Sequence, residues 1–530
     1  MNILPALPGK RLAALACCAA GLLLGGCAVN TTVADPLKAS AQATGVPVAV
    51  SITANTDEIS GFDTIKLRRV AEGEKPGEFK LVAENLVMKK VARGLARDTS
   101  LFIGALPPGE YEFVELIDIS SNKLLRVYSR TVGSFKVEAG KPTDLGRLVV
   151  TRANLSIDLG RSARVVSNGE LIRRFAPEYS KLFGADAVPG WKNPRDPRDA
   201  VEEFARAHPA GAECVTEMPD GRVVAASRMG AVLQRSTQGV WSVLNSPSTE
   251  TLACLVPVDL PDAELLAVGE FGTMLRKPRD SDQLLPVDTG NLPPGNLLRI
   301  GGNDADGWYV MHRNGDQMGV FHSRRLAGGD WQSVRQFKVP RSYYYAAGFF
   351  WAWQDGGAMG YAMLDGRIAE VDYGTGKWSE RNAPRKAKLA SFRHWPDGTE
   401  SVLIQAGLMG RFPDAYISRD RGRNWTQIVS PFKVLMSPAV PLRDGRLLLE
   451  AGMYNKKELH VSADQGKTWT PYADYALHGD PMMFASGLAL NVREGYSGIV
   501  SIHSSSDDAR TWKLEHSNFD VTTLVEQLKK

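Results

Sequence analysis

The stretch Ser462-Ala463-Asp464-Gln465-Gly466-Lys467-Thr468-Trp469 decides the fold, together with Ser418-Arg419-Asp420-Arg421-Gly422-Arg423-Asn424-Trp425. Both follow the pattern Ser-x-Asp-x-Gly-x-x-Trp, and their tryptophans lie 44 residues apart. A third copy, 505–512, has Ala509 in place of the glycine. The aspartate can accept backbone N–H groups across a tight turn, the glycine allows a positive φ, and the tryptophan packs under the hairpin. The pattern therefore predicts a structural turn and supports no catalytic role for its acid or arginines.

Tryptophans that close a turn recur along the last 320 residues, at positions 241, 331, 378, 425, 469 and 512. The gaps are 90, 47, 47, 44 and 43 residues, so the first gap is two periods with one tryptophan missing near residue 286. Glycine-containing hairpin turns such as Pro396-Asp397-Gly398 recur in the same register, and Leu260-Pro261-Asp262 stands where one is lacking. Seven units of this length predict a seven-bladed β-propeller over 209–530, with six or eight blades as alternatives.

The chain before the repeats predicts a second β-domain and a helical segment. Phe135, Val137 and Ala139 alternate with polar residues before a turn, as in a half-buried strand. Short turns such as Pro107-Pro108-Gly109 complete the pattern of a small β-sandwich over 46–153, so the expected class is all-β. Residues 154–208 show helical spacing, with Pro177 splitting one helix and Pro209 ending another. We interpret them as a helical connector, or alternatively as an extension of the first domain.

The N-terminus has the features of a secretion signal over residues 1–26. Lys10 and Arg11 precede an apolar run that is too short to span a bilayer. Leu24-Gly25-Gly26-Cys27 resembles the bacterial lipobox, which implies cleavage before Cys27 and lipidation of that cysteine. Ala28 in the next position implies the outer membrane. A plain signal peptide is the alternative, and the polar residues 27–45 predict a flexible tether.

Charge and cysteine content limit the partners that can be expected. The formal net charge of +4 falls to +2 when residues 1–26 and their two positive charges are removed. The charged residues are interspersed, so we expect no nucleic-acid partner. The repeat register places Cys214 and Cys254 at the start of the innermost strands of adjacent blades, with side chains pointing the same way around the ring. We therefore expect no disulfide between them, although an oxidising compartment permits one.

The three copies of the turn pattern resemble the Asp-box, also called the BNR repeat, of a β-propeller superfamily. The stretch from Ala267 to Arg276 resembles the propeller repeats of the photosystem II assembly and stability factor. These resemblances imply boxes on the periphery of the propeller, and they bring no catalytic residues to this chain. The residues expected to have this structural role are Ser418, Asp420, Gly422, Trp425, Ser462, Asp464, Gly466, Trp469, Ser505, Asp507 and Trp512.

A glycan-acting hydrolase of the sialidase type is the main enzymatic alternative, because Asp-boxes are common in sialidases. Those enzymes are six-bladed and usually carry a Phe/Tyr-Arg-Ile-Pro motif, whereas this chain offers only Phe392-Arg393-His394-Trp395-Pro396. Gly466-Lys467-Thr468 lacks the first glycine of a phosphate loop. The eight histidines are scattered without zinc-site spacing. We predict no catalytic residues, no metal and no cofactor.

One aromatic cluster is a candidate binding surface. Seven aromatic residues fall between Tyr343 and Trp353, in the region expected to connect two blades. They can form the inner strands of blade four, or Tyr343, Tyr344 and Tyr345 can form an exposed rim for a protein or glycan. We therefore predict an outer-membrane lipoprotein that acts as a non-catalytic binding or assembly scaffold, with an envelope protein or a glycan as its partner.

Overall fold

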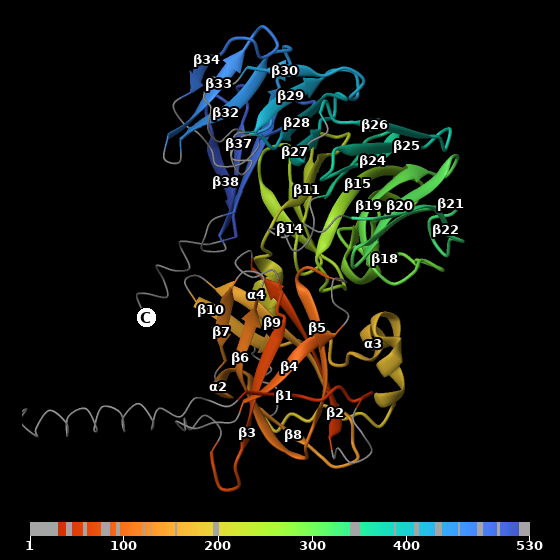
Figure 1. Ribbon diagram of the computed structural model, residues 1–530, viewed down its shortest axis with the longest axis vertical. Coiled ribbons are helices and arrows are strands. Elements are labelled where there is room, and N and C mark those ends of the chain that lie inside the picture. The colour runs from red at the N-terminus through yellow and green to blue at the C-terminus, as the bar shows by residue number, and fades with distance from the viewer. Residues whose placement is uncertain are drawn as a thin grey trace, which may run out of the picture.

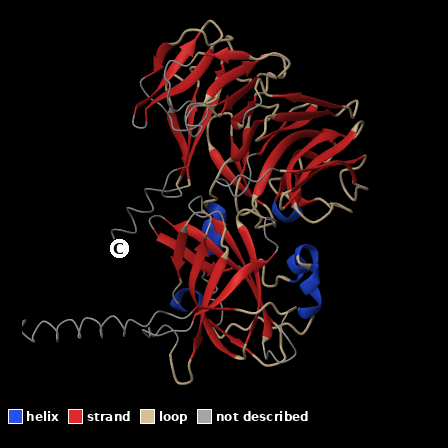
Figure 2. Cartoon of the chain, in the orientation of Figure 1, coloured by secondary structure: helices blue, strands red, loops and turns tan. Residues whose placement is uncertain are grey.

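The computed structural model consists almost entirely of β-strands with a few short helices (Figure 2). It describes residues 30–38, 45–56, 61–75, 85–91, 96–119, 122–127, 129–153, 156–193, 201–339, 350–385, 388–406, 413–429, 437–453, 456–473, 481–494 and 499–518. Two bodies are visible, an N-terminal sheet domain and a propeller at the opposite end of the long axis (Figure 1).

The N-terminal domain is built on one hydrogen-bonded path of strands in the order β10-β9-β2-β5-β4-β3-β6-β7, with β1 paired to β4 and β8 paired to β6. Its described strands are β1 (Asn30–Thr32), β2 (Val46–Asn55), β3 (Thr64–Val70), β4 (Asn85–Val91), β5 (Thr99–Leu106), β6 (Gly109–Asp118), β7 (Lys123–Arg126), β8 (Ser134–Val137), β9 (Thr143–Ala153) and β10 (Ser156–Arg161). The predicted β-domain is present, but its strands are joined in one path and a two-sheet sandwich is not confirmed.

The core of this domain contains alternate side chains of β2, β3, β5 and β6, because a strand points successive residues to opposite faces. Val48, Val50 and Ile52 of β2 pack there with Phe102 and Phe113. Within the segment 27–45 that was expected to be a flexible tether, the described residues 30–38 begin with β1, which pairs in parallel with β4 and is docked on the sheet. Thr31, Thr32 and Val33 have the β-branched side chains that favour a strand, which the polar composition of the segment had concealed.

Short helices lie beside the sheet and between the two bodies. They are α2 (Ser129–Val132), α3 (Gly169–Phe175), the 3-10 helix η1 (Pro177–Leu182) and α4 (Val201–Ala207). Pro177 separates α3 from η1, as the sequence predicts, and α4 ends before Pro209. Ile172 and Phe175 pack in one buried cluster with Leu101 of the sheet domain and Phe271 of the propeller. The helical segment therefore contacts both bodies.

The described residues from 213 onward form seven four-stranded antiparallel sheets, which confirms the predicted seven blades. The blades are β11–β14 (Glu213–Glu217, Val223–Ala226, Ala231–Arg235, Trp241–Asn245), β15–β18 (Leu252–Leu260, Ala263–Gly269, Met274–Lys277, Leu285–Pro286), β19–β22 (Asn296–Asn303, Gly307–Asn314, Gln317–Ser323, Gln332–Lys338), β23–β26 (Phe350–Gln354, Ala358–Met363, Arg367–Asp372, Trp378–Asn382), β27–β30 (Leu389–His394, Glu400–Ile404, Asp414–Ser418, Thr426–Ile428), β31–β34 (Val440–Pro441, Leu447–Met453, Lys456–Ser462, Thr470–Ala473) and β35–β38 (Met482–Met483, Ala489–Glu494, Val500–Ser505, Lys513–Ser517).

The periodic tryptophans stand at or just before the fourth strand of their blades, as Trp241 and Trp378 do in β14 and β26. The blade without one has a fourth strand of only two residues, Leu285–Pro286. Leu260 and Ala263 flank the turn between β15 and β16, where the sequence lacked the usual glycine turn. The spacing of the tryptophans therefore predicted the position even of the blade that lacks one.

The ring closes between blade seven and blade one through side chains. Val223 and Leu233 of blade one pack with Leu490 and Ile502 of blade seven in one buried cluster. The Arg235 Nε donates to Glu515 Oε2 at 2.7 Å, and the Trp241 Nε1 donates to the same oxygen at 3.2 Å. Among the described residues, each of these two blades takes its four strands from consecutive sequence, and the contacts that join them involve side chains, including Glu217, which accepts the Ser486 N–H.

The expectation about the two cysteines is wrong, because Cys214 and Cys254 form a disulfide with a Cα–Cα distance of 4.9 Å. They do lie in β11 and β15, the first strands of adjacent blades. However, the pairing register shifts at both positions, between Glu213 and Thr216 and between Leu252 and Cys254. Cys214 also has a φ of 46°, outside the strand region. These irregularities break the regular alternation of side chains and turn the two sulfur atoms toward each other.

Candidate functional site

The three box aspartates accept hydrogen bonds within their own turns. Asp420 Oδ1 accepts from the Ser418 hydroxyl at 2.7 Å and from the Asn424 backbone N–H at 2.8 Å. These bonds, led by that of the Asn424 N–H, lower the pKa of Asp420 to about 2. The same contacts recur at Asp464 and Asp507. A carboxylate held ionised in this way has its acceptor positions in use, so it is a poor general acid.

The remaining box residues complete the turns. The N–H groups of Gly422 and Gly466 each donate to the box serine, Ser418 or Ser462, at 2.8 Å. Ala509 keeps the positive φ of the glycines, at 67°, and donates to Ser505 at 3.0 Å. The indole N–H of Trp469 donates to the Val429 carbonyl and that of Trp512 to the Ala509 carbonyl, while Trp425 packs against the core between blades four and five.

Arg421, the variable residue before the first box glycine, reaches out of its turn to the preceding blade. Its backbone has a φ of 56°, and its guanidinium contacts Asp355 Oδ2 at 2.8 Å and Glu370 Oε1 at 3.4 Å. Both acids belong to blade four, whereas Arg421 belongs to blade five. The box therefore does more than close a hairpin, because it supplies one member of a charge cluster between two blades.

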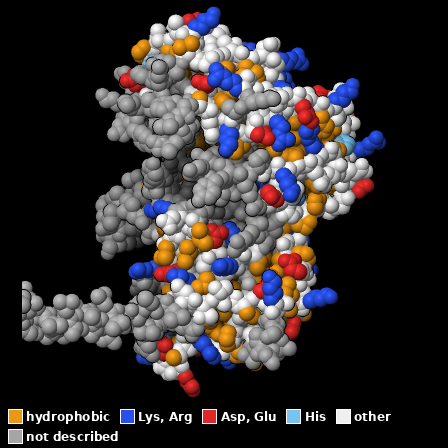
Figure 3. All heavy atoms as spheres, viewed as in Figure 1, with side chains coloured by type: hydrophobic (Ala, Val, Ile, Leu, Met, Phe, Trp, Pro, Cys, Tyr) orange, Lys and Arg blue, Asp and Glu red, His pale blue; other side chains and the backbone are white. Residues whose placement is uncertain are grey.

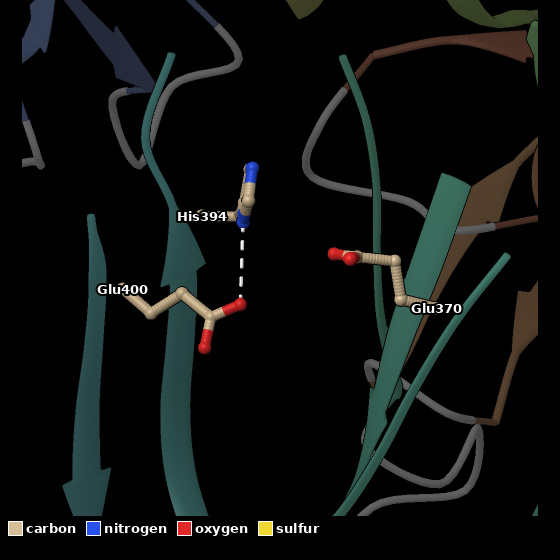
Figure 4. A group of neighbouring side chains, drawn as sticks. All are labelled: Glu370, His394 and Glu400. Atoms are coloured by element: carbon tan, nitrogen blue, oxygen red, sulfur yellow. Dashed lines mark hydrogen bonds and ion pairs between the residues drawn. The ribbon is translucent and has the colours of Figure 1, made fainter. Parts of the chain in front are cut away.

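The centre of that cluster is formed by Glu370, His394 and Glu400, with Glu370 in β25 facing His394 and Glu400 from the next blade (Figure 4). The Glu400 side chain is fully buried, and its Oε1 lies 3.3 Å from His394 Nδ1. His394 Nε2 lies 3.4 Å from Asp355 Oδ2. Arg381 of blade four donates to Glu400 and lies 3.8 Å from Glu370 Oε2. Six ionisable groups from two blades thus meet in one place.

The charges of these six groups balance when His394 is protonated, since three carboxylates then face two guanidinium groups and one imidazolium. Burial opposes protonation of His394, but its hydrogen bonds to Asp355 and Glu400 outweigh burial and raise its pKa. Burial likewise opposes ionisation of Asp355, and the contacts of His394 and the Gly357 N–H lower its pKa to about 2 nevertheless. The cluster is therefore a compensated ion network that ties blade four to blade five.

The ligand atoms of Glu370, His394 and Glu400 all lie within 4.8 Å of one another, which is close enough to hold a metal ion. Arg381 already occupies this place with a fixed positive charge, because it donates to Glu400. A metal ion would have to displace the guanidinium. The donor set is chemically suitable for a divalent cation, but the geometry favours the arginine as the resident cation.

A second network of buried charges joins the propeller to the N-terminal domain. Arg147 of β9 is 2% exposed, and its Nη1 donates to both Thr249 Oγ1 and Glu250 Oε1 at 2.7 Å. Arg228 of blade one donates from Nε to Asp98 Oδ2 at 3.1 Å, and both side chains are almost completely buried. One arginine comes from each body, so both buried ion pairs exist only when the two bodies are docked, and removing one partner would leave the other charge buried and unpaired.

Glu270, in the 3-10 helix η2 (Glu270–Gly272) between β16 and β17, is the centre of this junction. Its Oε1 accepts the backbone N–H groups of Arg97 and Asp98, at 2.5 Å and 2.8 Å. Burial, supported by the charge of Asp98, raises the pKa of Glu270 to about 8. The neighbouring Phe271 packs edge-to-face on Phe175 with a centroid distance of 4.7 Å. Polar and apolar contacts therefore hold the same surface of the propeller against the N-terminal domain and its helices.

Asn55 and Arg206 extend the junction at its edge. The Asn55 Nδ2 donates to the carbonyls of Ala205 and His208, and its Oδ1 accepts the Ala210 N–H at 2.8 Å. The Arg206 Nη2 donates to the Ser246 carbonyl at 2.7 Å. One side-chain amide thus fixes the exit of α4 into the propeller. The junction was not predicted from the sequence, because its partners lie from 40 to 173 residues apart and follow no periodic pattern.

The sequence-based candidates for binding and anchoring, Tyr343, Tyr344, Tyr345 and Cys27, lie outside the described residues. The described part of the same aromatic cluster is packed between blades. Phe350 lies 6.0 Å from Phe337, measured between ring centroids, and Trp353 stacks on His394 at 5.3 Å. These rings therefore fit the alternative in which the aromatic residues belong to the inner strands of blade four. The described end of the cluster therefore belongs to β23, and its earlier residues lie outside the described part of the chain.

Two features of the surface complete the description. A cavity of about 440 Å³ lies between blades six, seven and one and is lined by Arg235, Arg443, Gly487 and Asp508, among others. On the face seen in Figure 3, basic and acidic side chains are interspersed, as the near-balanced composition leads one to expect. Among the helices that the structure describes, none is long and apolar enough to cross a membrane.

No protein-family model matches the chain, and no curated protein matches it in sequence. Solved structures similar to it include a puromycin hydrolase, with 12% identity, a TM-score of 0.39 and coverage of 61% of this chain and 55% of that protein. YCF48 from Cyanidioschyzon merolae shows 11% identity, a TM-score of 0.38 and coverage of 53% and 92%. A YCF48 bound to a D1 peptide shows 14% identity, a TM-score of 0.39 and coverage of 53% and 90%. Such distant likenesses carry no argument about function.

Proposed function

We propose that this protein is a non-catalytic binding or assembly scaffold of the cell envelope, anchored in the outer membrane by lipid on Cys27. The observation that carries the proposal is the buried junction between the two bodies. A scaffold must hold its binding surface in a defined place, and the pairs of Arg147 with Glu250 and of Arg228 with Asp98 fix the propeller on the N-terminal domain. The propeller is then a presented platform, with an envelope protein or a glycan as its partner.

The anchor rests on Leu24-Gly25-Gly26-Cys27 and on the signal-like residues before it. The disulfide between Cys214 and Cys254 supports an address outside the cytoplasm, because such bonds persist in oxidising compartments. Ala28 supports the outer membrane over the inner one, in line with the lipobox resemblance. The three Ser-x-Asp motifs support membership of the Asp-box propellers, in which repeated boxes are structural.

The binding surface proposed is the connection that carries Tyr343, Tyr344 and Tyr345. It joins the fourth strand of one blade to the first strand of the next. Connections of the same kind, such as that between β14 and β15, carry the junction contacts of Thr249 and Glu250. The Asp-boxes join third strands to fourth strands and therefore lie at the opposite ends of the strands. A partner at the tyrosines is thus expected to approach from the side on which the N-terminal domain is attached.

Anchoring is tested by fractionating cells that produce the wild type or Cys27→Ala. The wild type is expected in the outer-membrane fraction with a lipid-modified mature N-terminus, and the variant is expected to be uncleaved or soluble. Mass spectrometry of the N-terminal peptide distinguishes the two. Unmodified Cys27 in mature protein extracted from membranes would overturn the anchor.

Partner binding is tested with Tyr343→Ala combined with Tyr344→Ala, and with Asp464→Ala as the matched control. The tyrosine variant is expected to lose partners in a pull-down of envelope proteins while its melting temperature stays near that of the wild type. The control is expected to melt earlier and to keep its partners. If the tyrosine variant melts early and retains every partner, its rings belong to the core and this surface is withdrawn.

The enzymatic alternative, a sialidase-like hydrolase, is assayed on the same preparations. The family resemblance implied six blades for such enzymes, whereas this propeller has seven. Glu370 and Glu400 lie near each other, and they are engaged with Arg421 and Arg381, respectively, between two blades. Release of sugar from an envelope glycan by the purified protein would replace the scaffold proposal.

A further inference from the structure

The segment that follows Cys27 is built into the N-terminal domain. Asn30, Thr31 and Thr32 of β1 pair with Asn85, Leu86 and Val87 of β4. The pairing continues after β1, because the Val33 N–H donates to the Val87 carbonyl and the Ala105 N–H donates to the Ala34 carbonyl, both at 2.9 Å. The segment thus inserts between β4 and β5.

Both neighbouring strands, β4 and β5, accommodate this segment. β4 pairs directly with β5 only at Lys90 and Val91, so the two strands diverge toward Asn85. The segment fills the opening, and Val33 packs on the core of the domain. Gly104 of β5 makes room for it, since a Cβ at that position would lie 2.7 Å from Val33 Cγ1. The Asn85 side chain also donates to Asn30 Oδ1 at 3.2 Å.

This docking leaves very little chain between the proposed lipid and the folded domain. Cys27 and Asn30 are three residues apart, so their Cα atoms are separated by at most about 11 Å in a fully extended chain. A flexible tether over 27–45 would have allowed the domain to move freely over tens of ångströms. A docked segment instead confines one end of the domain to the immediate neighbourhood of the lipid headgroups.

The confined end is the one that points away from the propeller. β5 begins at the junction, where the Thr99 hydroxyl donates to Glu250 of the propeller at 3.3 Å, and it ends at Leu106. Ala34 is bridged to Ala105 near that far end, and the chain toward Asn30 runs further in the same direction, antiparallel to β5. In Figure 1 β1 likewise lies well below the propeller.

We propose that the end of the N-terminal domain around Asn30 and Asn85 rests on the headgroups of the bilayer, so that the propeller is held at a fixed orientation on the membrane-distal side. The inference rests on the proposed lipidation of Cys27. Several of the described exposed charges near this end are neutralised by pairing, with Lys136 and Lys141 on Glu138 and Lys192 on Glu110. The lipid chains therefore supply the affinity, and the contact is expected to depend little on the salt concentration.

The test measures energy transfer from a donor dye on the lipidated protein to an acceptor dye on the headgroups of phosphatidylethanolamine and phosphatidylglycerol vesicles. One variant carries the donor at Lys141→Cys, at the proposed membrane end, and the other at Val429→Cys, which is 59% exposed on blade five. The native disulfide is left oxidised. Transfer at position 141 is expected to be several-fold more efficient than at position 429, and this ratio is expected to persist at high salt.

A third variant inserts about ten glycine and serine residues between Val29 and Asn30, which adds roughly 17 Å of root-mean-square reach. Its transfer efficiency at position 141 is expected to fall clearly while the protein still floats with the vesicles. Equal transfer at the two sites in the parent protein, or no change on insertion, overturns the fixed orientation. Flotation separates the two proposals: protein that floats but shows no orientation rejects only this inference, whereas protein that does not float rejects the anchor and the inference with it.

Discussion

The boxes with the pattern Ser-x-Asp and the domain junction both surround carboxylates with hydrogen-bond donors, but they differ in where the donors come from. The Ser418 and Asn424 groups that bind Asp420 lie within four residues of it. The backbone donors to Glu270 lie more than 170 residues away. A box can therefore form as soon as its own turn forms, whereas the junction exists only when both bodies are folded. Loss of a junction group should consequently be far more damaging than loss of a box group.

The largest effect is expected for Arg228→Ala, which removes the buried guanidinium from Asp98 and leaves this carboxylate only the more distant and half-exposed Arg97. Breaking a buried ion pair on one side costs about 3–5 kcal/mol of unfolding free energy. Urea unfolding followed by tryptophan fluorescence measures the loss. Arg279→Ala is the matched control, since its pair with Asp259 is exposed, and it should change stability little. Similar losses for the two variants would show that the junction is not a buried network.

The same comparison explains how much of the molecule could be predicted. The seven blades were predictable because each repeats a local pattern, and even the blade without its tryptophan kept its place in the period. The disulfide was mispredicted because bulges at Cys214 and Cys254 change the side-chain direction, and bulges leave no clear trace in the residue pattern. The docking of β1 and the buried contacts of Glu270 were not foreseen, because both depend on partners that only the tertiary fold brings close.

The pH dependence of stability should distinguish the junction from the boxes. Glu270 has a folded pKa of about 8, above its ordinary value of 4.5, so the folded state holds a proton that the unfolded state has lost. Its favourable contribution is complete below pH 4.5 and is lost as the pH rises through about 8. The melting temperature of the wild type should therefore fall over this range more steeply than that of Glu270→Gln. Parallel profiles for the two proteins would assign the pH dependence to other groups.

Loss of the disulfide is expected to lower the stability less than loss of the pair between Arg228 and Asp98 does, although the disulfide also joins distant residues. It closes a loop between positions 40 residues apart, and its loss should cost about 2–4 kcal/mol. Cys254→Ser, which leaves Cys214 reduced, should melt at a lower temperature than the wild type in the absence of reductant. Added dithiothreitol should lower the wild type to the level of the variant, whose own melting should not change. A reductant effect of equal size on Cys254→Ser would show that another process is responsible.

The smallest effects on stability are expected for substitutions of the box glycines. Gly422→Ala and Gly466→Ala both force alanine into the left-handed region, at φ values of 72° and 83°, at a cost of about 1–2 kcal/mol each. At Gly466 the nearest atoms to the new Cβ would be Ile428 Cγ1 and Cγ2, both at 3.1 Å. At Gly422 it would lie 2.6 Å from both Arg381 Nε and Glu400 Oε2, inside the ion network between blades four and five.

Gly422→Ala should therefore lower the melting temperature more than Gly466→Ala does, because it disturbs partners beyond its own turn. Ala509 shows that the turn itself tolerates a Cβ, since it already holds a φ of 67° in the third box. Thermal melting of the two variants, prepared in parallel, measures the difference. Combining Gly422→Ala with Glu400→Gln should give less than the sum of the two single losses, because both changes act on one network. Equal losses for the two glycine variants would show that the box of blade five is as local as the others and that Arg421 alone links it to blade four.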